Sequence, residues 1–313
     1  MIVPTVGRAL VGRLLDSLSD WAGAHETIVV DNGTGAADLD GAVAGLEGAR
    51  VMRLDSNLGF SRAVNLAAEE AEGETLVLLN DDSVVDPGFV ASLIGGLDPA
   101  AGIVMAAGVM RDAGSPELIE TAGMEIDRTL LAFDYLNGEP IDILEAEIPD
   151  PIGPSGAAAA IDRGAFRDVG GFDENLFAYL EDVDLALRLR CAGGSCRLAR
   201  GARGLHEHSA SLGPGSLRKD YLMGYGRGYL LRKWSVITPR RLPGIVAREV
   251  VVSAGQAVFD RNLEGVRGRF SGLRAGRRLQ PYPPPAVLPA PPSLGTALRR
   301  RWSRRARLRR RNA

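Results

Sequence analysis

The chain has 313 residues, 45% of them hydrophobic, and a formal net charge of −2. Such a length and composition allow one large α/β domain or two small ones. Its two cysteines, Cys191 and Cys196, cannot form a disulfide framework and lack metal-ligand spacing. There is no charged-then-apolar leader, and no apolar run reaches the roughly 18 residues of a spanning helix, so we expect a reducing, cytoplasmic location without membrane insertion.

Charge is distributed unevenly along the chain. Residues 299–313 hold nine arginines and no acid, so taking these nine positive charges from the net −2 leaves −11 on residues 1–298. An acidic body argues against nucleic acid as the main partner.

Strand-like and helix-like segments alternate in the first third of the chain. The strand-like segments are residues 1–4, 27–31, 50–55 and 76–85, and the helical ones are residues 10–21 and 57–73. This order and spacing predict an α/β fold with a mostly parallel sheet, right-handed crossovers and a ligand crevice at the carboxyl ends of the strands.

The rest of the sequence predicts further strands and helices, followed by a proline-rich linker and an arginine-rich tail. In order, we expect a helix at 89–97, a strand at 103–110, a hairpin or excursion at 119–135, a strand of small residues at 153–163, a helix from about 180, a short strand at 196–199, and helices from 217 to 270. Residues 280–292 form a proline-rich linker before the arginine tail, which we expect to be disordered. We therefore divide the chain into residues 1–215, a helical extension at 216–279, and a linker and tail at 280–313.

The central strand ends on polar residues. Its apolar run stops at Asn80, Asp81 and Asp82. Adjacent carboxylates repel each other and are tolerated best beside a divalent cation, a phosphate-bound metal or open solvent. An acidic, solvated turn before the next helix is the alternative interpretation.

A second acidic group lies about a hundred residues further on. Glu181 and Asp182 fall in the first turn of a predicted helix, where the helix dipole favours acids for capping alone. The two acidic pairs can also have different chemical roles. One would hold a divalent metal on a diphosphate leaving group, and the other would accept a proton from an attacking hydroxyl. Oxygen ligands suit Mg²⁺ or Mn²⁺, and an imidazole such as that of His206 favours Mn²⁺. On a strand, His206 and His208 share a face, which allows a two-histidine site, although such a pair is more often a surface or core feature.

Motifs of several other enzyme classes are missing. The sequence contains no GxGxxG after its first strand, no GxxxxGK[ST] and no GxSxG. Their absence counts against a dinucleotide-dependent dehydrogenase, a P-loop enzyme and a hydrolase with a nucleophile elbow.

An ordered set of segments resembles the family 2 glycosyltransferases of the GT-A fold, particularly their rhamnosyltransferase-like bacterial branch. The segments are IVPTVGR, IVVDNG, NLGFSRAVN, LLNDDSVV, GGFDENLFAYLEDVDL and LHEHSAS. The resemblance implies a GT-A catalytic domain over residues 1–215. It also implies inverting transfer of a sugar, rhamnose by analogy with that branch, from a nucleoside diphosphate donor to a hydroxyl of a saccharide or lipid-linked saccharide in cell-envelope glycan synthesis.

The resemblance also implies roles for individual residues. The donor-side positions are Thr5 and Asp31 at the base and ribose, Asn57, Gly59 and Asn65 beside the nucleotide, and Asp81 at the ribose or metal shell. The metal ligands for Mn²⁺ or Mg²⁺ are Asp82 and His206. The acceptor-side positions are Gly156, the general base Asp182, and Glu181, which orients the base or the acceptor.

Two departures from the family pattern leave alternatives open. Asn80 replaces the first acid of the family's DxD element, and Val64 stands where many members carry an arginine, a contact that Arg62 would then supply. A sugar nucleotidyltransferase and a non-catalytic carbohydrate-binding protein on the same fold are the rival interpretations. The basic, aromatic segments after Leu217 indicate either peripheral contact with the inner face of the plasma membrane or a solvated charged face.

Overall fold

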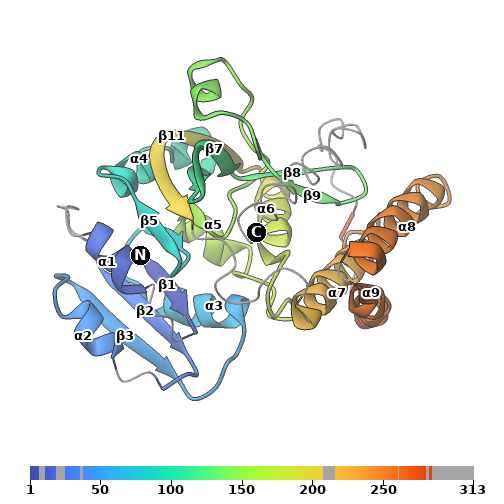
Figure 1. Cartoon of the computed structure of the whole chain (residues 1–313), viewed down its shortest axis with the longest axis horizontal. Coiled ribbons are helices and arrows are strands. Elements are labelled where there is room, and N and C mark those ends of the chain that lie inside the picture. Colours follow the sequence, from blue (N-terminus) through green and yellow to red (C-terminus); the bar gives the residue numbers. More distant parts are fainter. Residues whose placement is uncertain are drawn as a thin grey trace.

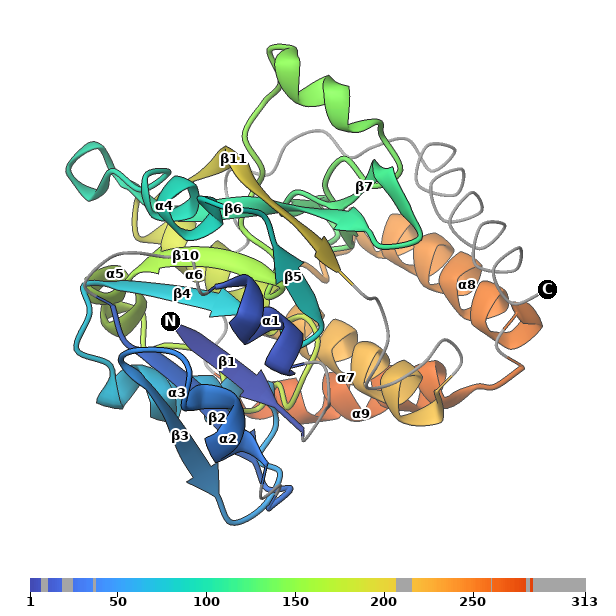
Figure 2. The ribbon, with the colours of Figure 1, turned by 60° about the vertical axis from the view of Figure 1, so that its left-hand side comes forward.

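The computed structural model describes residues 1–6, 11–18, 25–35, 38–206, 216–259, 261–279 and 282–283. Within these residues one large mixed sheet has the strand order β3-β2-β1-β4-β10-β6-β11-β5, with β7 paired to β6, and β8 and β9 form a separate pair (Figures 1 and 2). The strands are β1 (Ile2–Thr5), β2 (Thr27–Asn32), β3 (Ala49–Leu54), β4 (Thr75–Leu79), β5 (Ser83–Val85), β6 (Ile103–Asp112), β7 (Ser115–Thr121), β8 (Met124–Ile126), β9 (Ala132–Asp134), β10 (Ala158–Asp162) and β11 (Ser195–His206).

Helices cover both faces of this sheet, with buried apolar clusters on each side. They are α1 (Val11–Ser17), α2 (Leu39–Val43), α3 (Phe60–Glu70), α4 (Phe89–Ile94), α5 (Arg163–Asp168), α6 (Glu181–Cys191), α7 (Leu217–Lys233), α8 (Leu242–Phe259) and α9 (Glu264–Ala275). The helices α1, α2 and α4 share one cluster, whereas α3, α5, α6 and α7 share the other. In the part of the chain described, no helix is long and apolar enough to cross a membrane.

The first half of the sheet is parallel, as predicted. Strand β1 pairs in parallel with β2 and β4, and β2 pairs in parallel with β3. Every residue of β2 is buried, which explains its unbroken apolar run, and α3 packs on the sheet through Ala63, Val64 and Ala67. The carboxyl ends of these strands therefore meet at one edge.

The second half of the sheet is mixed. Strand β10 runs antiparallel to both β4 and β6, and β5 and β7 are also antiparallel to their partners. Strand β11 pairs in parallel with β6, so this half of the sheet contains both strand directions. The small side chains Ala158, Ala159 and Ala160 are buried in β10 between its two partners.

The C-terminal helices pack on the sheet domain. Tyr229, Leu230 and Trp234 lie in the same buried cluster as α3 and α6. Helices α7 and α9 pack backbone to backbone through glycines (Figure 2): a Cβ on Gly224 would lie 2.1 Å from the carbonyl oxygen of Gly265. The division at residue 215 remains a prediction, but α7 completes the core of the preceding residues. Most of the predicted linker and tail lies outside the described residues.

A buried ionic network joins α6 to α7. Asp184 is fully buried and accepts hydrogen bonds from Arg188 Nε at 2.8 Å, Lys233 Nζ at 2.8 Å and Trp234 Nε1 at 3.0 Å. Lys233 also donates to Asp173 at 2.6 Å. Burial alone would raise the pKa of Asp173, but the hydrogen bond and charge of Lys233 lower it to about 2. Loss of Lys233 would leave the buried Asp184 and the half-buried Asp173 short of positive charge.

We therefore predict that Lys233→Met lowers the free energy of unfolding by about 3 kcal/mol, because breaking a buried ion pair leaves its partner uncompensated. The measurement is urea unfolding followed by circular dichroism. Arg232→Met is the matched control, since the Arg232 side chain is exposed on the same turn, and it should change stability by less than about 0.5 kcal/mol. Equal effects of the two substitutions would contradict this account.

Candidate active site

Three of the predicted donor-side residues lie at the carboxyl ends of β1, β2 and β4. Asp81 follows β4, is buried, and accepts a hydrogen bond from Thr5 Oγ1 at 2.7 Å. Asp31 at the end of β2 is 1% exposed, and its Oδ1 accepts from the backbone nitrogen and hydroxyl of Thr34. Asp31 Oδ2 has no hydrogen-bond partner among the described residues. A buried carboxylate oxygen that lacks a hydrogen-bond partner favours a ligand that donates to it, such as a ribose hydroxyl or a base N–H.

The loop before α3 is fixed beside Asp31. Asn32 donates to the carbonyl of Gly59 at 3.0 Å and accepts from the backbone of Leu58 at 2.8 Å. The side chain of Asn57 accepts from the backbone nitrogen of Gly59 at 3.0 Å. Gly59 has φ +85°, and a Cβ there would lie 2.4 Å from the carbonyl oxygen of Phe177. Sequence reasoning missed Asn32, although it directly follows Asp31 on the same strand.

Asn65 forms hydrogen bonds with the loop that contains Phe172. Its amide donates to the carbonyl of Phe172 at 2.9 Å and accepts from the Phe172 backbone nitrogen at 2.8 Å. Both functional groups of the side chain are therefore used to hold this segment. Phe172 lines a pocket with Asp182, so Asn65 positions the wall of that pocket.

The second acid after β4 pairs with the predicted imidazole. Strand β5 runs antiparallel to β11 with Ser83 opposite His206, which brings the preceding Asp82 beside the histidine. Asp82 Oδ1 and His206 Nε2 lie 2.9 Å apart. The other ring nitrogen, Nδ1, lies 3.1 Å from Glu120 Oε2, and all three side chains are buried. Burial alone would lower the pKa of His206, but the two carboxylates raise it to about 10.

Glu120 was not predicted from the sequence. The register between β6 and β7 shifts at this position, because Met110 pairs with Thr121 while Arg111 pairs with Ile119. Such a bulge turns a side chain away from the regular alternation, here toward His206. The sequence offers no signal for it, since only the tertiary pairing distinguishes Glu120 from the exposed Glu117 on the same strand.

The donor set of Asp82 and His206 fits a divalent cation. Asp82 and His206 bring a carboxylate oxygen and an imidazole nitrogen within 2.9 Å of each other, and both atoms would be available to one divalent cation once Nε2 carries no proton. Carboxylate and imidazole together suit Mn²⁺. No group of three or more metal-binding side chains was found within the described ranges, so phosphate oxygens and water would supply the other ligands. His208 lies outside these ranges.

The second acidic pair begins helix α6. Asp182 accepts hydrogen bonds from the backbone nitrogens of Val183 at 2.8 Å and Gly156 at 3.3 Å, and burial raises its pKa. Glu181 is 7% exposed, and its Oε2 has no hydrogen-bond partner among the described residues. Burial, with the charge of Asp182, raises the pKa of Glu181 well above its usual value. Glu181 is therefore favoured as a neutral acid and Asp182 as the carboxylate.

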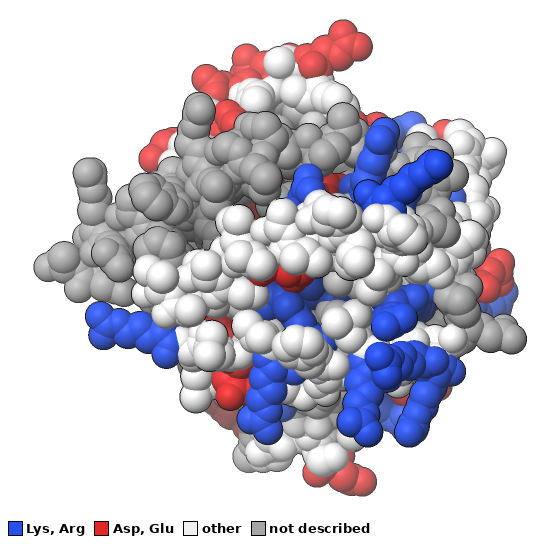
Figure 3. Space-filling model, turned by 90° about the vertical axis from the view of Figure 1, so that its right-hand side faces the viewer, with Lys and Arg blue, Asp and Glu red and all other residues white. Residues whose placement is uncertain are grey.

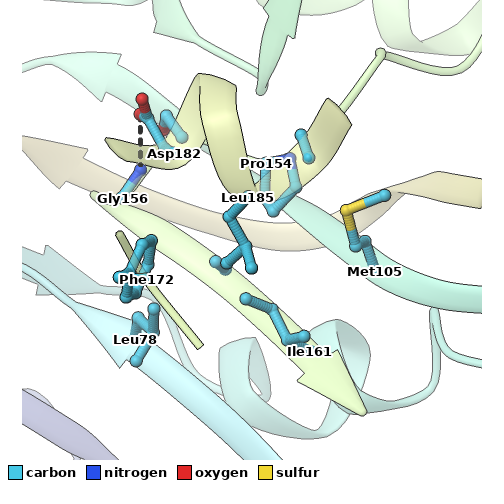
Figure 4. Close-up of a pocket in the computed structure, with 11 residues that line it drawn as sticks. Leu78, Met105, Pro154, Gly156, Ile161, Phe172, Asp182 and Leu185 are labelled. Atoms are coloured by element: carbon cyan, nitrogen blue, oxygen red, sulfur yellow. Dashed lines mark hydrogen bonds between the residues drawn. The ribbon is translucent and has the colours of Figure 1, made fainter. Parts of the chain in front are cut away.

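The chain enters α6 through a strained turn. Tyr179 and Leu180 have φ values of +72° and +69°, and such conformations cost of order 1–3 kcal/mol each for residues other than glycine. This turn starts α6 at Glu181, so that Asp182 meets Gly156 (Figure 4). The pocket beside this contact is lined by Leu78, Met105, Pro154, Ser155, Gly156, Ala159, Ile161, Phe172, Asp182, Leu185 and Ala186.

The two acidic pairs lie at the same edge of the sheet. Strand β10 pairs with β4 through Ala158 and Leu79, and Asn80 donates to the carbonyl of Ala157 at 3.4 Å. Gly156, one residue further back, binds Asp182. The structure thus brings Asp81 and Asp82, which follow Asn80, to the same end of β4 and β10 as Asp182.

This sheet and its acid-lined edge define a protein of the GT-A type. The solved structure of GalNAc-T7 with UDP, GalNAc and Mn²⁺ superposes with a TM-score of 0.58 at 16% identity, covering 74% of this chain and 47% of that one. The mannosyltransferase PcManGT from Pyrobaculum calidifontis, in complex with GDP-Man and Mn²⁺, gives a TM-score of 0.52 at 16% identity, covering 89% of this chain and 74% of that one. These likenesses confirm the expected fold.

The chain belongs to glycosyl transferase family 2, whose profile matches residues 1–169. It is 29% identical over 217 residues to N-acetylglucosaminyl-diphospho-decaprenol L-rhamnosyltransferase of Mycobacterium tuberculosis, covering 59% of this chain and 67% of that protein. It is 28% identical over 244 residues to the O-antigen biosynthesis protein RfbC of Myxococcus xanthus, covering 72% of this chain but only 18% of that protein. The expected membership of family 2 is confirmed, and the chain is similar to a rhamnosyltransferase.

We predict that Gly59→Ala lowers the free energy of unfolding by more than about 2 kcal/mol, because the new methyl group meets backbone and the residue has a left-handed φ. The measurement is chemical unfolding. The control is Gly12→Ala in α1, where no heavy atom lies within 4 Å of the added Cβ and alanine should stabilise the helix. A Gly59→Ala protein as stable as the wild type would show that this loop does not need glycine.

Proposed function

We propose that this protein is a metal-dependent, inverting glycosyltransferase. It transfers a sugar from a nucleoside diphosphate donor to a hydroxyl of a saccharide or lipid-linked saccharide in cell-envelope glycan synthesis. The observation that carries the proposal is the meeting of the Asp82–His206 pair and Asp182 at one sheet edge. The rhamnosyltransferase of Mycobacterium tuberculosis supports an L-rhamnosyl donor and a diphospho-polyprenol acceptor.

The donor nucleoside binds at the ends of β1 and β2. Asp31 Oδ2, which has no partner in the part of the chain that the structure describes, accepts from the base or ribose, and Thr5 holds Asp81 toward the ribose. Asn57 and Gly59 shape the adjacent loop, which Asn32 ties to β2. Asp82 and His206 hold Mn²⁺ or Mg²⁺, which when bound supplies positive charge to the departing diphosphate.

Asp182 accepts the proton of the acceptor hydroxyl. Its raised pKa makes it a stronger base than an ordinary aspartate while it still ionises, and the neutral form of the adjacent Glu181 avoids a second negative charge. The deprotonated oxygen attacks the anomeric carbon as the bond to the diphosphate breaks, so the proton goes to Asp182 and the electron pair leaves with the nucleoside diphosphate. Attack from the Asp182 side, opposite the leaving group, inverts the anomeric configuration.

We predict that Asp182→Asn lowers kcat/KM at least about a hundredfold, because the amide cannot accept the proton. The measurement is release of nucleoside diphosphate from dTDP-rhamnose and other nucleotide sugars, with Mn²⁺ present and a lipid-linked saccharide as acceptor. The control, Asp168→Asn on α5, removes an exposed carboxylate and should leave the rate unchanged. The wild-type rate should fall at acidic pH with a midpoint above that of an ordinary aspartate, since the base must be ionised. An Asp182→Asn enzyme with wild-type turnover would remove the assignment.

We predict a second effect at Glu120, which holds His206 from the side away from Asp82. Glu120→Gln should weaken Mn²⁺ binding about tenfold to a hundredfold, because a ligand histidine depends on the carboxylate that orients its ring. Isothermal titration calorimetry with Mn²⁺ and nucleoside diphosphate measures this directly. Glu117→Gln, on the exposed face of the same strand, is the control and should bind Mn²⁺ as the wild type does. Unchanged affinity of the Glu120 variant would argue against a metal at His206.

A further inference from the structure

Helix α8 has its polarity reversed relative to an ordinary surface helix. Its exposed residues are all apolar and none is charged: they are Leu242, Pro243, Val246, Ala247, Val250, Val251, Ala254, Ala257 and Val258. Val250 is 61% exposed and Val258 68% exposed. A soluble helix normally turns such a stripe toward the core.

The polar residues of α8 face the protein instead. Arg248 pairs with Asp127 at 3.0 Å, and Glu249 pairs with Arg227 and Arg269 at 2.7 and 2.6 Å. Gln256 is buried and hydrogen-bonds Arg269 at 3.1 Å. These ion pairs fix the orientation of α8, so its apolar face cannot turn inward without breaking them.

Cationic side chains surround this apolar face. The segments next to α8 add Leu263 and Phe270 as exposed apolar residues. Their exposed basic residues are Arg240, Arg261, Arg267, Arg274, Arg277 and Arg278. On the side of the molecule that carries α8 and α9, uncharged atoms form a broad area bordered by Lys and Arg, while most acidic side chains lie toward the margins (Figure 3). The apolar face can contact acyl chains and the arginines around it can bind anionic headgroups, so this surface is complementary to an anionic lipid bilayer.

We propose that α8 docks this protein on the surface of an anionic lipid bilayer, lying parallel to it with the apolar face at the boundary between headgroups and acyl chains. The arginines around the apolar face of α8 explain why an anionic bilayer is a better partner for this face than a second copy of the chain. Two copies joined through this face about a two-fold axis would bring their arginines together, whereas anionic headgroups neutralise them.

The docking helix is attached next to the acceptor side of the candidate site. Arg248 of α8 binds Asp127, the residue after β8, and Arg227 of α7 donates to the carbonyl of Thr129 in the same turn. The partner strand β9 carries Asp134, whose negative charge acts together with burial on Asp182. A bilayer under α8 would thus lie beside the part of the molecule that receives a lipid-linked acceptor.

Flotation of the full-length protein tests the proposal. The wild type should float with vesicles of phosphatidylcholine and phosphatidylglycerol and float less with phosphatidylcholine alone. Val246→Gln/Val250→Gln should reduce binding to the anionic vesicles about tenfold or more, because two valines no longer favour the apolar boundary. The charge is unchanged in this variant, and glutamine is a better helix former than valine, so circular dichroism should show intact helix.

A matched pair of substitutions controls for surface changes elsewhere. Ala44→Gln/Ala91→Gln alters two exposed positions on the sheet domain and should float as the wild type does. Wild-type flotation of the Val246/Val250 variant, or failure of the wild type to bind anionic vesicles, would overturn the proposal. So would analytical ultracentrifugation that shows a wild-type dimer lost in the valine variant without any lipid binding. Hydrolysis of nucleotide sugar without lipid should be equal in all three proteins, so failure of the docking proposal stays distinct from failure of the proposed activity.

Discussion

Negative charge buried at one edge of the sheet is the constraint on which this structure depends. Asp31, Asp81 and Asp82 are nearly inaccessible to water, and Glu120 approaches from another strand. His206 lies between Asp82 and Glu120 with a pKa raised to about 10, so its imidazolium balances part of this charge. A divalent cation on Nε2 requires the ring to lose its proton there, so metal binding and protonation of His206 exclude one another. A divalent cation would offset the carboxylates at this edge, which supports the proposal that a metal binds there together with the donor diphosphate.

The sequence predicted the elements that carry local signals. The apolar run of β4 followed by two acids, the acids of α6 and the glycine-bearing turn before α3 all lie where their patterns indicated. Glu120 could not be predicted, because its approach to His206 follows from a register shift between two strands. The separate strand β5 was also missed: the pattern read it as a continuation of β4, and only its pairing with β11 defines it. In each case the missing information was a contact between distant segments.

Helix α8 shows a different limit of sequence reasoning. Its sequence is mostly apolar, with Arg248, Glu249, Ser253 and Gln256 as its polar residues, and the usual assumption buries the apolar side chains. The opposite holds because Arg248, Glu249 and Gln256 find charged and polar partners on α7, α9 and the turn after β8. Those partners are spread over more than a hundred residues, so amphipathicity alone could not show which face is buried. Asn65 is a milder example, since its two hydrogen bonds to Phe172 assign it to the wall of the acceptor-side pocket.

The distribution of charge explains how docking through α8 would orient the molecule. Residues 1–298 carry −11, whereas the exposed basic residues next to α8 are six arginines. An anionic surface attracts the arginine-bordered side and repels the acidic body, so electrostatics alone favours one orientation before any apolar contact forms. In that orientation the parallel half of the sheet, with Asp31 and Asp81, projects into solvent, where nucleotide sugars diffuse. Helix α7 joins α6 to the docking helix, because its Lys233 binds Asp184, two residues after the proposed base, and its Arg227 pairs with Glu249 of α8. One rigid scaffold would then present the donor site to solvent and the acceptor site to lipid.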